Sequence, residues 1–158
     1  AWRAAPDGGT LMALPPGGTL ISSLNVDARI DDITEATGWH GTLAEQEGWP
    51  EATRFALELS LEEALTNVVS YGFAGSGETP RIRIDCYRLP QGRIAVRLVD
   101  NGIPFDPTSI AEPEVPDSIE DARIGGHGVQ LMRHFLETLA YDRVGDENQL
   151  TLVVAGPK

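Results

Sequence analysis

Residues 57–73 read LELSLEEALTNVVSYGF, and this stretch decides the fold. Its apolar residues occupy more than one stripe of a helix, which is typical of a helix that is largely buried. Pro50 is suited to open the helix, and Gly72 is a residue common at helix C-termini. We therefore predict a buried helix over 51–71. Its apolar positions are Phe55, Leu57, Leu59, Leu61, Ala64, Leu65, Val68 and Val69.

Two polar residues of this helix are candidates for chemistry. Glu63 and Asn67 are four residues apart, so they project from the same face. Burying them costs free energy unless something pairs with them. An amide oxygen can coordinate Mg²⁺, and a carboxylate can take the proton of an attacking hydroxyl. The alternative is an ordinary solvated edge of the helix, and the spacing alone leaves both interpretations open.

Alternating apolar and polar residues predict strands before and after this helix. The strands cover 19–24, 80–88, 93–99, 140–144 and 149–154, and further helices cover 27–46 and 128–138. This segregation predicts an α+β fold, a two-layer sandwich of one mixed, mostly antiparallel sheet with helices on one face. We expect residues 1–18 to be a flexible lead-in and residues 19–158 to form a single domain.

A second candidate motif directly follows a predicted strand. Asp100 ends the strand, and Asn101 and Gly102 follow it. A carboxylate at this place can accept a hydrogen bond from an exocyclic amine such as N6 of adenine, while Gly102 lets the backbone turn and approach the base. The alternative is a simple turn, since Asp, Asn and Gly are common turn residues.

A third motif opens the helix predicted near residue 128. Gly125-Gly126-His127-Gly128-Val129 combines a flexible backbone with a helix N-terminus, where free N–H groups and the helix dipole favour a phosphate. The alternative is a glycine hinge that closes a loop. Taken together, the three motifs account for the base, the phosphates and the metal of ATP-Mg.

The composition excludes several classes of protein. Twelve basic and 24 acidic residues give a net charge of −12, and Lys158 is the only lysine. Such a chain lacks the positive surface needed to bind nucleic acid or an anionic membrane, so both kinds of partner are excluded. P-loop and Schiff-base enzymes are also excluded, because they need an internal lysine. Cys86 is a single cysteine and no apolar run is long enough to cross a membrane, so we expect a cytoplasmic protein.

The three motifs together resemble those of the GHKL (Bergerat-fold) ATPases, which occur in the same order. Within this superfamily the chain is most similar to the anti-sigma factor serine-protein kinases, the RsbW-like regulators. The resemblance covers about residues 19–154. Its segments are 57–73, 100–106 (DNGIPFD), 126–132 (GHGVQLM) and 148–152 (NQLTL).

The resemblance implies a role for each site residue. Glu63 would be the catalytic base and Asn67 the Mg²⁺ ligand. Residues 107–123 would form an ATP lid, and Arg123, its only cation, would stabilise charge on the γ-phosphate. The remaining nucleotide-binding positions would be Asp100 and Gly102 at the adenine, and Gly126, His127, Gly128 and Val129 near the phosphates.

The resemblance also implies a function. The protein would use ATP-Mg to phosphorylate a Ser or Thr of an antagonist protein of the STAS type and would hold a sigma factor. It would thus regulate transcription as a homodimer, without contacting nucleic acid or membrane.

Three alternatives remain. One is a partner-switching module that binds nucleotide without catalysis. Two departures from the family pattern leave it open: Tyr71 replaces a His of many members, and Ile124 stands where we expect the family's Arg. The others are the ATP-binding domain of a histidine kinase and an α+β domain without nucleotide.

Overall fold

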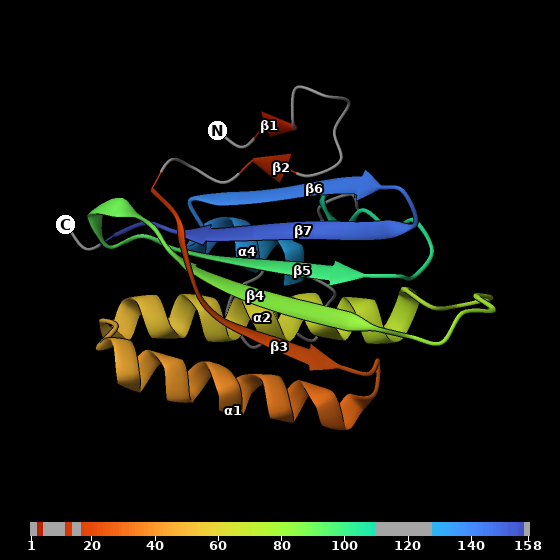
Figure 1. Ribbon diagram of the computed structural model, residues 1–158, viewed down its shortest axis with the longest axis horizontal. Coiled ribbons are helices and arrows are strands. Elements are labelled where there is room, and N and C mark those ends of the chain that lie inside the picture. Colours follow the sequence, from red (N-terminus) through yellow and green to blue (C-terminus); the bar gives the residue numbers. More distant parts are fainter. Residues whose placement is uncertain (1–2, 5–11, 14–16, 110–127, 157–158) are drawn as a thin grey trace.

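The structure is a computed structural model that describes residues 3–4, 12–13, 17–109 and 128–156. They form two main layers, a five-stranded sheet and the helices packed on it (Figure 1). The elements, in chain order, are β1 (Arg3–Ala4), β2 (Met12–Ala13), β3 (Thr19–Val26), α1 (Ile30–Glu47), α2 (Glu51–Tyr71), β4 (Ile82–Arg88), η1 (Pro90–Gly92), β5 (Ile94–Asp100), η2 (Pro107–Ser109), α4 (Gly128–Phe135), β6 (Thr138–Val144) and β7 (Glu147–Val154).

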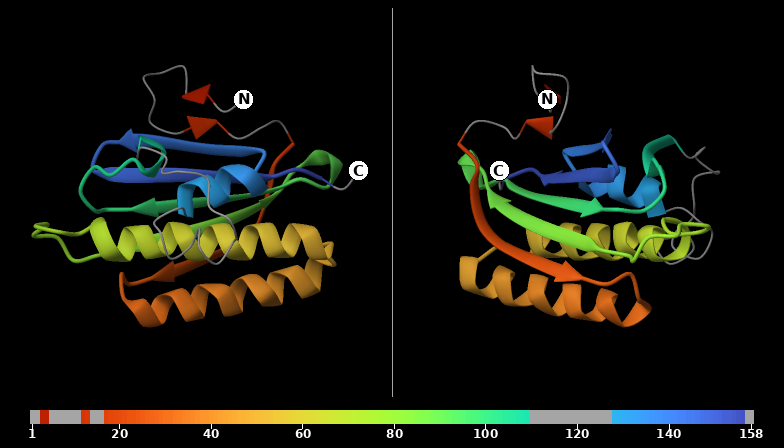
Figure 2. Two further views of the ribbon diagram at one scale, coloured as in Figure 1. Left: turned by 180° about the vertical axis from the view of Figure 1, so that it is seen from behind. Right: turned by 45° about the vertical axis from the view of Figure 1, so that its right-hand side comes forward.

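The main sheet has the strand order β3-β4-β5-β7-β6, and each strand is antiparallel to its neighbours. Helices α1 and α2 run side by side, and α4 packs next to α2 on the same face of the sheet (Figure 2). The predicted α+β sandwich is therefore confirmed, with a main sheet that is antiparallel throughout rather than mixed. β1 and β2 pair with each other in a separate antiparallel ladder.

α2 lies in the centre of the hydrophobic core, as its apolar surface predicts. Leu57, Leu61 and Leu65 are almost fully buried and belong to one cluster with the inward-facing residues of the sheet. Residues two apart along a strand share a face, which is why Ile82 and Ile84 of β4 both enter this cluster. The predicted bounds of α2 match the observed ones.

Two boundaries near the C-terminus differ from the prediction. α4 ends at Phe135 rather than at residue 138, because the N–H of Glu137 already donates to the carbonyl of Val153 in the sheet. The last hairpin is also tighter than predicted. Val144 pairs with Glu147, so only Gly145 and Asp146 form its turn, and Gly145 has the positive φ of 58° that such a turn requires.

None of the helices in the described part of the chain is long and apolar enough to span a membrane.

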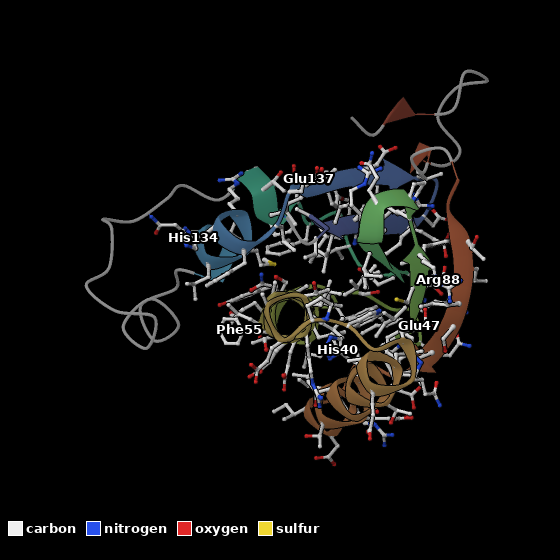
Figure 3. All side chains as sticks on the ribbon, turned by 90° about the vertical axis from the view of Figure 1, so that its left-hand side faces the viewer. His40, Glu47, Phe55, Arg88, His134 and Glu137 are labelled. Carbon is white, nitrogen blue, oxygen red and sulfur yellow. The ribbon has the colours of Figure 1, made fainter. Side chains whose placement is uncertain are left out.

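α1 buries a histidine against the rest of the core (Figure 3). His40 is 2% exposed, and its ring lies 5.5 Å from that of Trp49. Neither ring nitrogen finds a hydrogen-bond partner among the residues that the structure describes. Burial, reinforced by the positive charge of Arg54, lowers the pKa of His40 to about 4. The imidazole therefore stays neutral in the folded protein at pH values where an exposed histidine is charged.

We predict that the folded state loses stability as the pH falls from about 6.5 towards 4. In this window His40 takes up a proton in the unfolded chain but not in the folded one, which corresponds to at most about 3 kcal/mol. Replacing His40→Leu should flatten the pH dependence of the unfolding free energy measured in urea. The matched control is His134→Leu on α4, an exposed histidine whose removal should leave the wild-type slope. Equal slopes in all three proteins would contradict the assignment.

Candidate functional site

A buried carboxylate stands at the end of β5. Asp100 is 4% exposed, and its Oδ1 accepts hydrogen bonds from the N–H of Gly102 and from Nδ2 of Asn148, both at 2.9 Å. Burial raises the pKa of Asp100, while these two bonds and the positive charge of Arg143 oppose the rise. Among the described residues none donates a hydrogen bond to Oδ2, so this oxygen is available to a ligand.

Asn148 on β7 connects this carboxylate to the loop that follows it. Its Nδ2 also donates to the carbonyl of Ile103 at 2.7 Å. Its Oδ1 accepts from the hydroxyl of Tyr141 and from the N–H of Phe105. With two donors and two acceptor positions in use, the amide of Asn148 is saturated. A buried amide with a full set of partners holds all of them in one arrangement.

Gly102 marks a close approach of two backbones. A Cβ at this position would lie 2.2 Å from the carbonyl oxygen of Gly72, just beyond α2. The N–H of Ile103 donates to the same carbonyl at 2.7 Å. Only glycine fits here, because any side chain would separate the loop from α2. The loop after Asp100 is therefore fastened to α2 on one side and to β7 on the other.

A small pocket opens between α2, the end of β5 and β7. Asn67 and Asp100, which the sequence predicts as metal ligand and base acceptor, both line it. Most of the remaining lining is apolar, and a few convergent polar groups in an apolar pocket are typical of a ligand site. The lining residues are Ala64, Asn67, Val68, Gly72, Leu98, Asp100, Phe105, Pro107, Tyr141, Asn148 and Leu150.

Glu63 lies one helical turn before Asn67 and is half-buried. A Cβ added to Gly128 would come 2.5 Å from Oε2 of Glu63, so this carboxylate lies directly against the start of α4. The predicted base is thus next to the helix terminus predicted to bind phosphate. The side chain of Val129 packs into the core, so only its backbone can face a ligand.

The remaining predicted positions, Arg123, Gly126 and His127, lie outside the described residues. The same holds for the predicted lid beyond Ser109. Its beginning is described: η2 follows the pocket residue Phe105, and Nη2 of Arg133 on α4 donates to the carbonyl of Thr108 at 2.8 Å. α4 therefore holds the first residues of the predicted lid in place.

No role at the site was predicted for Asn148, Tyr141 or Arg143. Asn148 entered only as the first residue of segment 148–152, which resembles the final strand of the RsbW-like regulators. Their role depends on strand register, which pairs Asp100 with Asn148 and Asn148 with Arg143. Tyr71 stacks on Phe105, with ring centroids 5.7 Å apart.

Asn67 fits the metal role through its donor chemistry, because its side chain lines the pocket with an oxygen that suits Mg²⁺. In the described part of the chain, no three His, Cys, Asp or Glu side chains form a cluster that could hold a metal. Water or a bound nucleotide could supply further ligands to a metal at this site. Such sharing is usual for Mg²⁺, which binds one or two protein groups plus substrate phosphates.

Comparisons with known proteins place this chain in a family. The family model of the histidine kinase-like ATPase domain matches residues 26–154. The histidine kinase domain of the Erythrobacter litoralis EL346 blue-light activated histidine kinase aligns with a TM-score of 0.49 at 16% identity, over 77% of this chain and 60% of that one.

Two curated relatives are similar in sequence. The serine/threonine-protein kinase BtrW of Bordetella bronchiseptica is 35% identical over 130 residues, 82% of this chain and 90% of BtrW. The serine-protein kinase RsbW of Listeria innocua is 34% identical over 92 residues, 54% of this chain and 57% of RsbW. The chain therefore belongs to the histidine kinase-like ATPase family and is a relative of the serine-protein kinases BtrW and RsbW.

Proposed function

We propose that the protein is an ATP-Mg-dependent serine-protein kinase of the anti-sigma type. The observation that carries the proposal is the convergence of three predicted motifs on one place. Asn67 and Asp100 line a common pocket, and Glu63, one turn before Asn67, lies against the start of α4 at Gly128. The names of the relatives BtrW and RsbW support the same activity.

The adenine would be recognised by Asp100. Its Oδ1 is occupied by Gly102 and Asn148, which leaves Oδ2 to accept a hydrogen bond from the exocyclic amine. The apolar side chains of Val68, Leu98 and Leu150 line the pocket around it. A flat base would bury its faces against such side chains, while its amine fixes its orientation.

The phosphates would lie between Asn67 and the first turn of α4. Backbone N–H groups at a helix N-terminus favour an anion. Because Gly128 has no side chain, the start of α4 comes close to Glu63. Bound Mg²⁺ would neutralise phosphate charge and hold the oxygens in place. Arg123 would add a further positive charge from the lid.

Glu63 would act as the base. The hydroxyl oxygen of the acceptor Ser or Thr attacks the γ-phosphorus, the bond between that phosphorus and the β–γ bridging oxygen breaks, and ADP leaves. The hydroxyl proton passes to the carboxylate of Glu63. The acceptor would belong to an antagonist protein of the STAS type.

A sigma factor would be the second partner of a cytoplasmic homodimer. The net charge of −12 supports an effect on transcription through protein contacts rather than through DNA.

A partner-switching module that binds nucleotide without catalysis is the second candidate. Its support is Tyr71, which stands at a position where many members carry a histidine. Tyr71 is 57% exposed and stacks on Phe105. A stacked phenol contributes packing but lacks the ring nitrogens of a histidine. The two candidates differ in phosphoryl transfer and not in nucleotide binding.

We predict that ATP-Mg stabilises the protein against thermal unfolding and that Asn67→Ala abolishes the Mg²⁺-dependent part of this effect. Saturation at about 100 times Kd should add about 2.7 kcal/mol. Thr66→Ala is the matched control, because Thr66 is the exposed neighbour of Asn67 and its hydroxyl donates to the carbonyl of Glu62 within the same helix. An Asn67→Ala protein that keeps the full Mg²⁺ effect would show that Asn67 is not the ligand.

We further predict that Glu63→Gln lowers phosphoryl transfer by about 10²- to 10⁴-fold while ATP affinity stays unchanged. The assay is transfer of label from ATP to the antagonist, which a search of the neighbouring genes should supply. Glu58→Gln, an exposed carboxylate of the same helix, should keep full transfer. Unchanged transfer in Glu63→Gln would rule out the base assignment. Intact ATP binding in a wild-type protein without transfer would favour the partner-switching module.

A further inference from the structure

Arg143 lies in the same row of the sheet as Asp100. The register pairs Asp100 on β5 with Asn148 on β7, and Asn148 with Arg143 on β6. Paired residues of neighbouring strands project to the same face, so the three side chains meet at one end of the sheet. From this position Nη1 of Arg143 donates to the carbonyl oxygen of Gly102 at 2.7 Å.

This contact differs from those of four other arginines. Arg29, Arg83, Arg88 and Arg93 each form an ion pair with a carboxylate. Within the described ranges, no carboxylate oxygen lies within 4 Å of Arg143, although the chain has 24 acidic residues. An ion pair therefore does not explain where this half-buried guanidinium lies, whereas the loop carbonyl does.

Gly102 is held from three directions. Its N–H donates to Asp100, its carbonyl accepts from Arg143, and its Cα packs against the carbonyl of Gly72. A movement of this glycine would break the bond to Oδ1 of Asp100. Removing Arg143 would therefore release the loop on the one side that neither α2 nor β7 secures.

We propose that Arg143 is a positioning residue for nucleotide binding, which holds Gly102 so that the carboxylate of Asp100 faces the base. The inference rests on the proposed adenine-binding role of Asp100. A hydrogen bond from a charged donor suits this task, because it is stronger than a neutral one. Arg143 itself does not line the pocket of Asp100.

The charge of Arg143 has a second effect on the same carboxylate. Asp100 accepts through both oxygens at once only when it is ionised, yet burial raises its pKa. Arg143 opposes that rise and Glu147 adds to it, while Tyr141 is the other titratable group in the pocket. α2 contributes only Ala64, Asn67 and Val68 to the lining near Asp100, and none of these titrates. Removal of Arg143 therefore raises the pKa of Asp100 further.

The test is the affinity for ADP-Mg, measured calorimetrically over a range of pH. In the wild type, binding should weaken at acidic pH as Asp100 becomes protonated. Arg143→Met should raise Kd by about tenfold near neutral pH, as expected for loss of one charged hydrogen bond. In this variant the acidic loss of binding should also begin at a higher pH.

Two further variants separate charge from geometry. Arg143→Lys keeps the charge but loses the planar guanidinium. Its Kd should therefore rise, while the acidic limb, the pH range over which binding weakens, stays near that of the wild type. Arg81→Met is the matched control. Arg81 lines a polar pocket together with Arg143, Asn101 and Gly102, yet none of the described side-chain hydrogen bonds joins its guanidinium to the loop. Both Kd and the acidic limb should remain unchanged in this control.

Several results would overturn the inference. If Arg143→Met binds with wild-type affinity, Arg143 does not position the nucleotide site. If it loses the same affinity at every pH, the role of Arg143 is purely structural. If Arg143→Met does not fold, an unchanged Kd in Arg143→Lys overturns the inference equally. A wild-type protein that fails to bind ADP-Mg would instead refute the proposed function, and the inference with it.

Discussion

A carboxylate buried at the end of a central strand needs hydrogen-bond donors, and this need organises one end of the molecule. Asp100 finds its donors in the N–H of Gly102 and in Asn148. Leaving such a group without partners would cost several kcal/mol, by the usual order of magnitude for a buried charge. Three features keep these donors in place: the β5–β7 register, the turn after Asp100 and the packing of that turn on α2.

α2 joins this polar end to the core. Its leucines hold the helix against the sheet, and this rigid packing fixes the positions of Glu63 and Asn67. The carbonyl of Gly72, just after the helix, receives the N–H of Ile103 from the loop that follows Asp100. A site built on packed elements is held more closely than one built on loops. The arrangement thus combines one rigid helix with a loop that is tied down at several points.

Much of this site can be predicted from local patterns. The spacing of Glu63 and Asn67 predicts a shared helix face, and the glycine after Asp100 predicts a close backbone approach. Asn148 and Arg143 could not be predicted in the same way, because strand pairing brings them to the site from far along the chain. Asn148 bonds Asp100 across 48 residues of sequence, and Arg143 bonds Gly102 across 41. A shift of one residue in that register would turn both side chains to the other face. The predicted end of α4 was wrong for a related reason, because the hydrogen bond of Glu137 to the sheet overrides helical periodicity.

The charge of the chain takes on a more specific meaning beside this site. A net charge of −12 repels a polyanion such as ATP, and the pocket has no lysine among its described lining residues to compensate. In the proposed function the start of α4 would supply backbone dipoles, and Asn67 would be a metal ligand that adds no negative charge. The one carboxylate in the described pocket lining, Asp100, accepts two hydrogen bonds at Oδ1 and lies in the field of Arg143. An acidic protein can therefore present a site for an anion, provided that its positive field comes from backbone, metal and a few arginines.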